Sequence, residues 1–322
     1  MHYLLKYIIL IPSLFISIHV AWADSYPTKS VRIVLPFGAG GVADITARTL
    51  AQKLSVSLGQ PVVVVNKPGA GGIVAGDFVA KSDPDGHTLL LMSNGSAVSV
   101  GLFKSLPFDT INDFKPISTL GFFDLAMVTT KDSPFKNLGE LLAFAKAQPG
   151  KLNIGSVNIG STQNLVAELF KSTAGIDVQI VPYNGSPAVI SALRGGQIDA
   201  SFEILGPVLP QIKANVLKAL IVTGETRAAV LPDVPTAKES GLPSFVAASW
   251  NALAVPAKTP KSVIDQLNKE ILLALNDPDV KNRLAGLNVN VRPSTPESAS
   301  ALLASEIVRW QKVIQDAKIP KR

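Results

Sequence analysis

The 322-residue chain contains no cysteine. Without a thiol it can form no disulfide, no thiolate metal site and no cysteine nucleophile. The acylated cysteine that anchors a bacterial lipoprotein is missing as well. Tryptophan, methionine and histidine are scarce, with three of each. These absences leave a chain whose binding chemistry must rest on backbone, hydroxyl, amide and charged groups.

Histidine chemistry is restricted in the same way. Only His87 follows the N-terminal apolar segment, so a cluster of histidine metal ligands is impossible and a Ser–His–Asp hydrolase would depend on this one residue. We interpret His87 as a surface residue beside the turn at Pro84-Asp85-Gly86. A Ser–Lys hydrolase remains the enzyme alternative. The sequence therefore predicts a protein that is not an enzyme, with no catalytic residue, metal or cofactor.

Nucleotide and nucleic-acid binding are also disfavoured. The stretch Gly38-Ala39-Gly40-Gly41-Val42-Ala43 fits the loose dinucleotide pattern G-x-G-x-x-A, but the next strand ends in Asn66-Lys67, without an acidic residue for a ribose hydroxyl. No Gly-Lys-Ser or Gly-Lys-Thr completes a P-loop. The 30 basic residues exceed the 24 acidic ones modestly and are scattered, which argues against a nucleic-acid partner. A weak positive charge suits a small anionic ligand.

The N-terminus indicates where the protein works. Lys6 precedes an apolar run at residues 7–20, and Ala21-Trp22-Ala23 forms a small-x-small cleavage site before Asp24. This is the layout of a secretory signal peptide at residues 1–23, and the run is shorter than the roughly 20 residues that a spanning helix needs. We expect a soluble, monomeric, periplasmic protein that begins at Asp24.

Beyond the signal peptide, apolar runs alternate with helical patterns, which is typical of wound α/β domains. The runs at 62–65 and 89–92 indicate strands buried on both faces. A comparable series begins after Pro116. The helical segments at the C-terminus have no sheet of their own, so we expect them to pack on the first domain.

The predicted fold class is α/β with two domains and two crossover segments. Domain 1 comprises residues 24–121 and 250–322, and domain 2 comprises residues 122–249. The crossovers are expected near residues 120–125 and 249–255. Two lobes joined in this way can close over a ligand by a hinge motion.

Three glycine-containing turns stand where predicted strands meet helices. They lie at residues 36–41, 158–162 and 183–187. The start of a helix leaves unpaired backbone N–H groups and favours negative charge, and glycine lets a ligand approach the main chain. Three such turns predict a site for an anion held largely by backbone amides.

A set of motifs in a fixed order resembles the Bug-type, or TctC-like, substrate-binding proteins of tripartite tricarboxylate transporters. The resemblance covers nearly the whole mature chain. The matching motifs are Pro36-Phe37 with Gly40-Gly41, Gly59-Gln60-Pro61-Val62-Val63-Val64, Pro68-Gly69-Ala70-Gly71-Gly72, Pro84-Asp85-Gly86, Gly160-Ser161-Thr162, Val181-Pro182-Tyr183, Leu231-Pro232-Asp233-Val234-Pro235-Thr236 and Gly241-Leu242-Pro243. The resemblance implies a Venus-flytrap receptor that binds a small carboxylate and delivers it to a permease of two integral membrane subunits.

The resemblance also implies the binding residues, which are expected on loops that face each other across the cleft. The first loop contributes Phe37, Gly40, Gly41 and Asp44, and the second contributes Asn158, Gly160, Ser161 and Thr162. Further polar contacts are expected from Ser93, Asn94 and Ser96, and from Tyr183, Asn184, Gly185 and Ser186. Structural roles compete with ligand binding for some of them: Asp44 can complement a helix dipole, Asn94 and Asn158 can be turn residues, and Tyr183 can be core.

Glu203 departs from the family pattern, since many members carry aspartate at this place. As a ligand contact it would accept a hydrogen bond from an amine or hydroxyl at the end away from the bound carboxylate; otherwise it is a rim residue. The ligand class stays open between di- and tricarboxylates, acidic amino acids and aromatic acids. A second alternative keeps the binding but changes the output, with the closed receptor reporting to a membrane sensor kinase.

Overall fold

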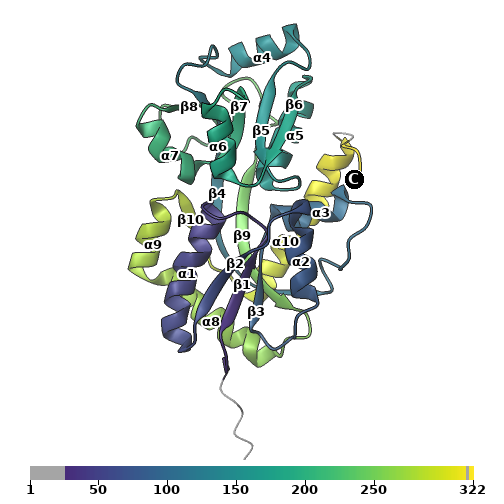
Figure 1. Cartoon of the computed structure of the whole chain (residues 1–322), viewed down its shortest axis with the longest axis vertical. Coiled ribbons are helices and arrows are strands. Elements are labelled where there is room, and N and C mark those ends of the chain that lie inside the picture. The colour runs from purple at the N-terminus through teal and green to yellow at the C-terminus, as the bar shows by residue number, and fades with distance from the viewer. Residues whose placement is uncertain (1–25, 317–318) are drawn as a thin grey trace, which may run out of the picture.

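The computed structural model describes residues 26–316 and 319–322, and the predicted signal peptide at residues 1–23 lies outside them. The molecule is elongated, with two lobes stacked along its long axis and strands running between them (Figure 1). Within the described part, no helix has both the length and the apolar character to cross a bilayer.

The first lobe opens with a parallel β-α-β-α-β unit in the spatial order β2-β1-β3. Its elements are β1 (Val31–Leu35), α1 (Val42–Leu58), β2 (Val62–Asn66), the short 3-10 helix η1 (Ala70–Gly72), α2 (Ile73–Ala80), β3 (Thr88–Ser93) and α3 (Asn94–Leu102). Alternate side chains of β1 serve two cores: Ile33 packs in the same apolar cluster as Leu50 of α1, and Val34 packs with Val79 of α2. Helices therefore cover both faces of this sheet, as a wound α/β unit requires.

The second lobe repeats the plan with the parallel order β7-β5-β6. Its elements are α4 (Leu138–Ala147), β5 (Asn153–Val157), α5 (Thr162–Ala174), β6 (Gln179–Tyr183), α6 (Ser186–Arg194), β7 (Ala200–Ile204), α7 (Leu205–Lys213) and β8 (Leu217–Val222). On one face the rings of Phe170, Phe202 and Phe245 lie 5.4–5.7 Å apart in edge-on or tilted contacts. On the other face, Val189 of α6 and Val208 of α7 share a cluster with Ala126.

Two antiparallel strands connect the lobes. β4 (Phe114–Thr130) and β9 (Ala248–Pro256) pair from Phe114 opposite Pro256 to Asp124 opposite Ala248. Beyond that point β4 continues into the second lobe and pairs with β7 and β8, while residues 251–254 of β9 also pair with β3 of the first lobe. The two predicted crossover segments therefore lie on neighbouring strands of one continuous sheet.

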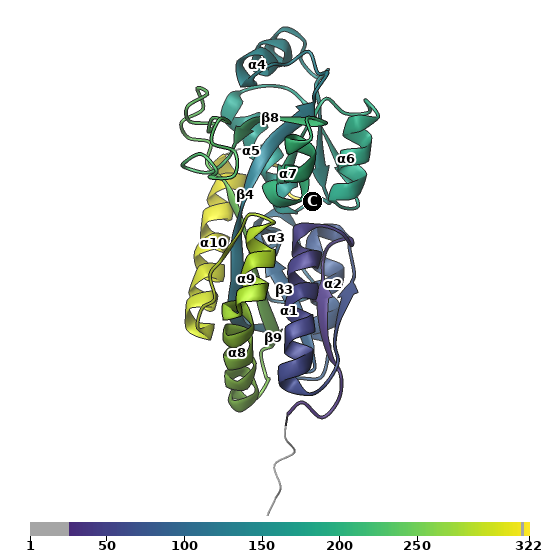
Figure 2. The ribbon, with the colours of Figure 1, turned by 90° about the vertical axis from the view of Figure 1, so that its left-hand side faces the viewer.

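The C-terminal elements pack on the first lobe, as the sequence predicts. They are α8 (Lys261–Asn276), α9 (Pro278–Ala285), β10 (Val289–Val291) and α10 (Pro296–Asp316). Figure 2 shows α10 running along the outer side of the two crossover strands. Its buried residues Leu303, Ile307 and Trp310 share an apolar cluster with Val98 of α3.

The structure corrects three local interpretations. The run at 62–65 is not buried on both faces, because β2 is the edge strand of the sheet and Val63 is 43% exposed. His87 is not a surface residue: it is buried, and its Nε2 accepts a hydrogen bond from the Thr28 N–H. Asn94, considered as a turn residue, is instead the first residue of α3.

Candidate functional site

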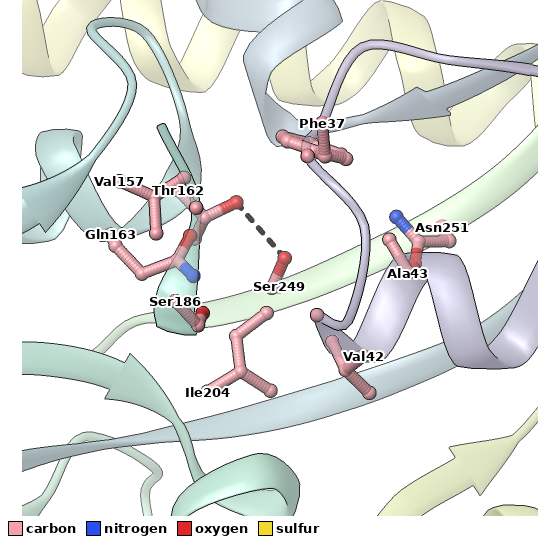
Figure 3. A pocket seen from close by; sticks show the side chains of 13 residues that line it. Phe37, Val42, Ala43, Val157, Thr162, Gln163, Ser186, Ile204, Ser249 and Asn251 are labelled. Atoms are coloured by element: carbon pink, nitrogen blue, oxygen red, sulfur yellow. Dashed lines mark hydrogen bonds between the residues drawn. The ribbon is translucent and has the colours of Figure 1, made fainter. Parts of the chain in front are cut away.

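A small pocket lies where three helix N-termini meet between the lobes. α1 starts at Val42 after Gly41, α5 starts at Thr162 after Ser161, and α6 starts at Ser186 after Gly185. We call the space between them the central pocket (Figure 3). It is lined by Phe37, Gly38, Gly41, Val42, Ala43, Val157, Thr162, Gln163, Gly185, Ser186, Ile204, Ser249 and Asn251. None of these side chains carries a charge.

The loop before α1 is held in shape by Asp44. Its carboxylate is buried and accepts hydrogen bonds from the Gly40 N–H at 3.1 Å, Arg48 Nε at 3.0 Å and Asn66 Nδ2 at 3.0 Å. Asn66 Nδ2 also donates to the Phe37 carbonyl at 3.0 Å. Asp44 is therefore placed as a brace for residues 37–41, and it does not line the pocket.

The acidity of Asp44 reflects this bracing. Burial raises the pKa of its carboxyl, but the hydrogen bonds from Arg48, Asn66 and the Gly40 amide outweigh that effect, and the charge of Arg48 adds to theirs. The pKa of Asp44 is consequently below its ordinary value, and the group is an anion at neutral pH. A negative charge in the first turn of α1 also complements the helix dipole.

In the second-lobe loop before α5, the hydroxyl groups of Ser161 and Thr162 have different roles. Ser161 caps α5: its Oγ accepts from the Asn164 N–H at 3.2 Å and donates to the Val157 carbonyl at 2.9 Å. Thr162 faces the central pocket, and its Oγ1 lies 2.9 Å from Ser249 Oγ of β9, the contact drawn in Figure 3. Only Thr162 of this pair therefore presents its side chain to the central pocket.

A second, narrower space lies beside the first, and Phe37 lines both. We call it the lip pocket; it is lined by Pro36, Phe37, Gly71, Gly72, Ser93, Gly95, Ser96, Asn158, Ile159, Gly160 and Ser161. Ser93 and Ser96 form a capping box on α3, so their hydroxyls already serve the helix start. Asn158 has an amide nitrogen without a hydrogen-bond partner among the described residues.

Asn94 ties α3 to a crossover strand. It is fully buried, its Nδ2 donates to the Ala248 carbonyl at 2.7 Å, and it lines neither pocket. Because Ala248 stands opposite Asp124 where β9 leaves the second lobe, this bond fixes the first lobe to the point at which the chain crosses over.

The two lobes touch through glycine backbone. A side chain at Gly38 would meet the Asn184 carbonyl oxygen at 2.5 Å, and one at Gly160 would meet the Gly71 Cα at 2.9 Å. Gly160 also has a φ of +82°, which other residues rarely adopt. The opposing loops therefore approach to main-chain contact, a closed arrangement that larger residues would prevent.

The residues of the predicted third loop, 183–187, lie partly in the wall of the central pocket and partly at the protein surface. Gly185 and Ser186 line the central pocket, while Asn184 is exposed and touches the first lobe through its carbonyl. Tyr183 is half-buried and packs against the apolar cluster of α6 and α7. Gly40 is exposed and lies near Pro187 rather than in either pocket.

Glu203 is fully buried behind this wall. Its Oε2 accepts a hydrogen bond of 2.7 Å from Ser186 Oγ, and its Oε1 has no hydrogen-bond partner among the described residues. Burial raises the pKa of Glu203 to about 7, against the opposing influence of Ser186 and Gln163. Two pocket-lining residues, Ser186 and Gln163, therefore stand between Glu203 and the central pocket.

Several pocket residues escaped the sequence analysis. Ser249 and Asn251 come from the second crossover strand, and Gln163 from the first turn of α5. Asn251 donates through Nδ2 to the Trp250 carbonyl, and its Oδ1 has no hydrogen-bond partner among the described residues. The crossover itself was the available signal, because strands that join two lobes form the floor of the space between them. Gly71 and Gly72, left outside the predicted site, line the lip pocket.

The central pocket offers neutral hydrogen-bond donors. The described residues contain no group of three or more histidine, aspartate or glutamate side chains that could hold a metal ion. Backbone N–H groups at three helix starts, with Thr162, Ser186 and Ser249 hydroxyls, can bind a negative group without a buried counter-charge.

The chain is similar to known receptors of tripartite transporters along most of its length. Residues 46–319 match the sequence profile described as "Tripartite tricarboxylate transporter family receptor". Protein BugT of Bordetella pertussis is 37% identical over 296 residues, 91% of each chain. The solved structure of MatC from Rhodopseudomonas palustris with bound malate is 33% identical, with a TM-score of 0.86 over 90% of this chain and 100% of that one. An R. palustris protein solved with adipate is 30% identical, with a TM-score of 0.88 over 92% of this chain and all of its own.

Proposed function

Because this chain belongs to the tripartite tricarboxylate transporter receptor (TctC, or Bug) family of periplasmic solute-binding proteins, we propose that it captures a small carboxylate between its lobes and hands it to a tripartite membrane permease. The lobes are assigned as residues 24–121 with 250–322, and residues 122–249. The signal peptide at residues 1–23 would deliver the protein to the periplasm. These assignments rest on the sequence patterns and on the course of β4 and β9.

One observation carries the proposal: the N-termini of α1, α5 and α6 meet at a pocket whose side chains are all uncharged. Each helix start directs unpaired N–H groups and positive dipole toward the same space, which favours an anion there. Neutral donors hold a carboxylate without the desolvation penalty of a buried ion pair. Two structural relatives were solved with adipate and with bound malate, which supports a carboxylate as the ligand class.

The same arrangement explains how capture would be coupled to closure. Two of the helix starts belong to the second lobe and one to the first. A carboxylate held by all three can be bound only when the lobes are together, so it would shift the hinge equilibrium toward the closed form. A closed receptor is the form that a permease can distinguish from the empty one.

Thr162 offers a direct test of the pocket. In Thr162→Val the hydroxyl is replaced by a methyl group of similar size, so a donor in the pocket is lost without a change in shape. We expect about a tenfold weaker affinity for the tightest-binding acid of a panel containing adipate and malate, measured by calorimetry on refolded protein. The matched control is Thr129→Val, which removes a buried hydroxyl from β4 outside the pocket. Equal affinities in the two variants would contradict the assignment.

A further inference from the structure

The contact between Ser186 and Glu203 places a proton-binding group directly behind the pocket wall. Ser186 is the first residue of α6 and lines the central pocket, and its Oγ lies 2.7 Å from Glu203 Oε2. Glu203 is wholly buried and does not line the pocket. Glu203 can therefore act on a ligand through the Ser186 hydroxyl, with which it shares a hydrogen bond; Gln163, also in the pocket wall, is its other polar neighbour.

The direction of this hydrogen bond depends on the proton of Glu203. An ionised carboxylate can only accept, so the Ser186 hydroxyl donates to it and offers lone pairs to the pocket. A protonated Glu203 can donate to Ser186 Oγ instead, which frees the serine O–H to point at a ligand. A ligand carboxylate at the start of α6 can only accept hydrogen bonds. It therefore fits the arrangement in which Glu203 is protonated and the Ser186 hydroxyl donates into the pocket.

Resting on the proposed function, we infer that Glu203 is a positioning residue that makes carboxylate binding depend on proton uptake: the receptor binds its ligand tightly when Glu203 is protonated and releases it as Glu203 ionises. No covalent step is involved. The proton comes from solvent and resides on the Glu203 carboxyl while the Ser186 O–H donates to the ligand.

The surroundings of Glu203 favour such a switch near neutral pH. Burial is the dominant cause that raises the Glu203 pKa to about 7, and the only groups opposing it are the neutral side chains of Ser186 and Gln163. β7 packs against β4, β5, α5, α6 and α7. The charged side chains on these elements are Lys115, Asp124, Glu168, Lys171, Arg194 and Lys213, and none of them perturbs Glu203.

Two titratable groups of the first lobe, Asp44 and His87, are poor sources of the same behaviour. Asp44 is kept ionised by its hydrogen bonds and keeps that charge throughout the neutral range. His87 precedes β3, whereas the residues of β3 and α3 that line the lip pocket begin at Ser93, at the other end of the strand.

The test is the pH dependence of affinity in wild type, Glu203→Gln and Ser186→Ala. The probe is the tightest-binding acid of a panel of mono-, di- and tricarboxylates and acidic amino acids, adipate and malate included. In the wild type, the affinity should fall roughly 30-fold from pH 6 to pH 8.5, the limit for one coupled proton. Calorimetry at pH 8 in two buffers of different ionisation enthalpy should show nearly one proton taken up per ligand bound.

The variants separate the proton switch from a structural role. The side-chain amide introduced by Glu203→Gln imitates the protonated carboxyl, since it can donate to Ser186 permanently, so this variant should bind tightly with less than threefold variation across this pH range. Ser186→Ala should bind weakly at every pH. Glu168→Gln is the matched control, because Glu168 also has a burial-raised pKa but lies in α5 near Arg322; its profile should equal that of the wild type.

Any of the following results would overturn the inference. The wild-type affinity could be independent of pH, its pH dependence could be unchanged in Glu203→Gln, or it could be lost in Glu168→Gln. Each of these three results would show that Glu203 is not the group whose protonation is coupled to binding, and would leave the receptor function intact. Failure of folded wild-type protein to bind any acid of the panel at any pH would overturn the proposed function and the inference together.

Discussion

The buried carboxyl of Glu203 predicts a stability that depends on pH in a definite direction. The ordinary pKa of a glutamate carboxyl, 4.5, applies in the unfolded chain, while burial raises the value in the folded protein to about 7. Between these values the folded state holds the proton and the unfolded state has released it. Folding stability therefore falls as pH rises from about 4.5 to about 7, and the loss is complete above pH 7.

The magnitude follows from the two pKa values. At about 1.4 kcal/mol for each tenfold change in acidity, the difference corresponds to roughly 3 kcal/mol for the wild type. Glu203→Gln has no proton to lose and keeps the shape of the side chain. Its stability relative to the wild type should rise by roughly 3 kcal/mol between pH 4.5 and pH 8, while the effects of all other titrating groups cancel in the comparison.

The assay is urea unfolding of ligand-free wild type and Glu203→Gln at closely spaced pH values from 4.5 to 8.5, with the free energy of unfolding extrapolated to water. A difference between the proteins that stays constant within about 1 kcal/mol across this range would refute the reasoning. It would mean that the Glu203 carboxyl is hydrated or paired in the folded protein in solution.

Two further predictions concern the loops that meet between the lobes. Gly38→Ala places a methyl group about 2.5 Å from the Asn184 carbonyl oxygen. We therefore expect at least a tenfold loss of affinity for a carboxylate, measured by calorimetry, with little change in the free energy of unfolding, measured in urea. Normal affinity would show that these loops do not meet in the bound form. Ser161→Ala removes the cap of α5, so it should lower the free energy of unfolding by about 1 kcal/mol, and an unchanged unfolding midpoint in urea would contradict the capping role.

Much of the fold could be predicted because its signals are local. The helix α4 at Leu138–Ala147 follows Asn137, whose side chain caps it, and a Pro-Gly pair ends the segment. The packing face of α10 was evident from the spacing of Leu303, Ile307, Trp310 and Ile314, all of which are buried. The paired crossovers were predictable because the last helices needed the first sheet to pack on.

Other features could not be read from local patterns. Whether an all-valine run is central or at an edge depends on which strand lies beside it, and β2 has a neighbour on one side only. α7 has no clear helical pattern in the sequence because Pro207 and Pro210 interrupt it, although Pro207 stands in the first turn, where proline is tolerated. The burial of His87 depends on Tyr26, which packs edge-on against its ring at 5.0 Å from a distant part of the chain.

The candidate site shows the same division between local and distant information. The glycine turns pointed to the starts of α1, α5 and α6, because strand-turn-helix junctions have a local signature. Which side chains face the pocket depends on contacts between distant segments: Ser161 turns inward to cap its helix, and Ser249 comes from a strand 87 residues beyond Thr162. The family pattern drew attention to Glu203, but the sequence contained no sign that Ser186 would separate it from the pocket.

The most direct test of the central claim compares a carboxylate with its own amide. Refolded mature protein is screened by thermal shift against the acid panel, and the best acid is then compared with the carboxamide of the same skeleton. Near 100 times its dissociation constant, the acid should stabilise the protein by about 2.7 kcal/mol, and the carboxamide should produce no shift because it brings no negative charge to the three helix starts. Equal shifts from the two compounds, or none from any acid on folded protein, would contradict the account.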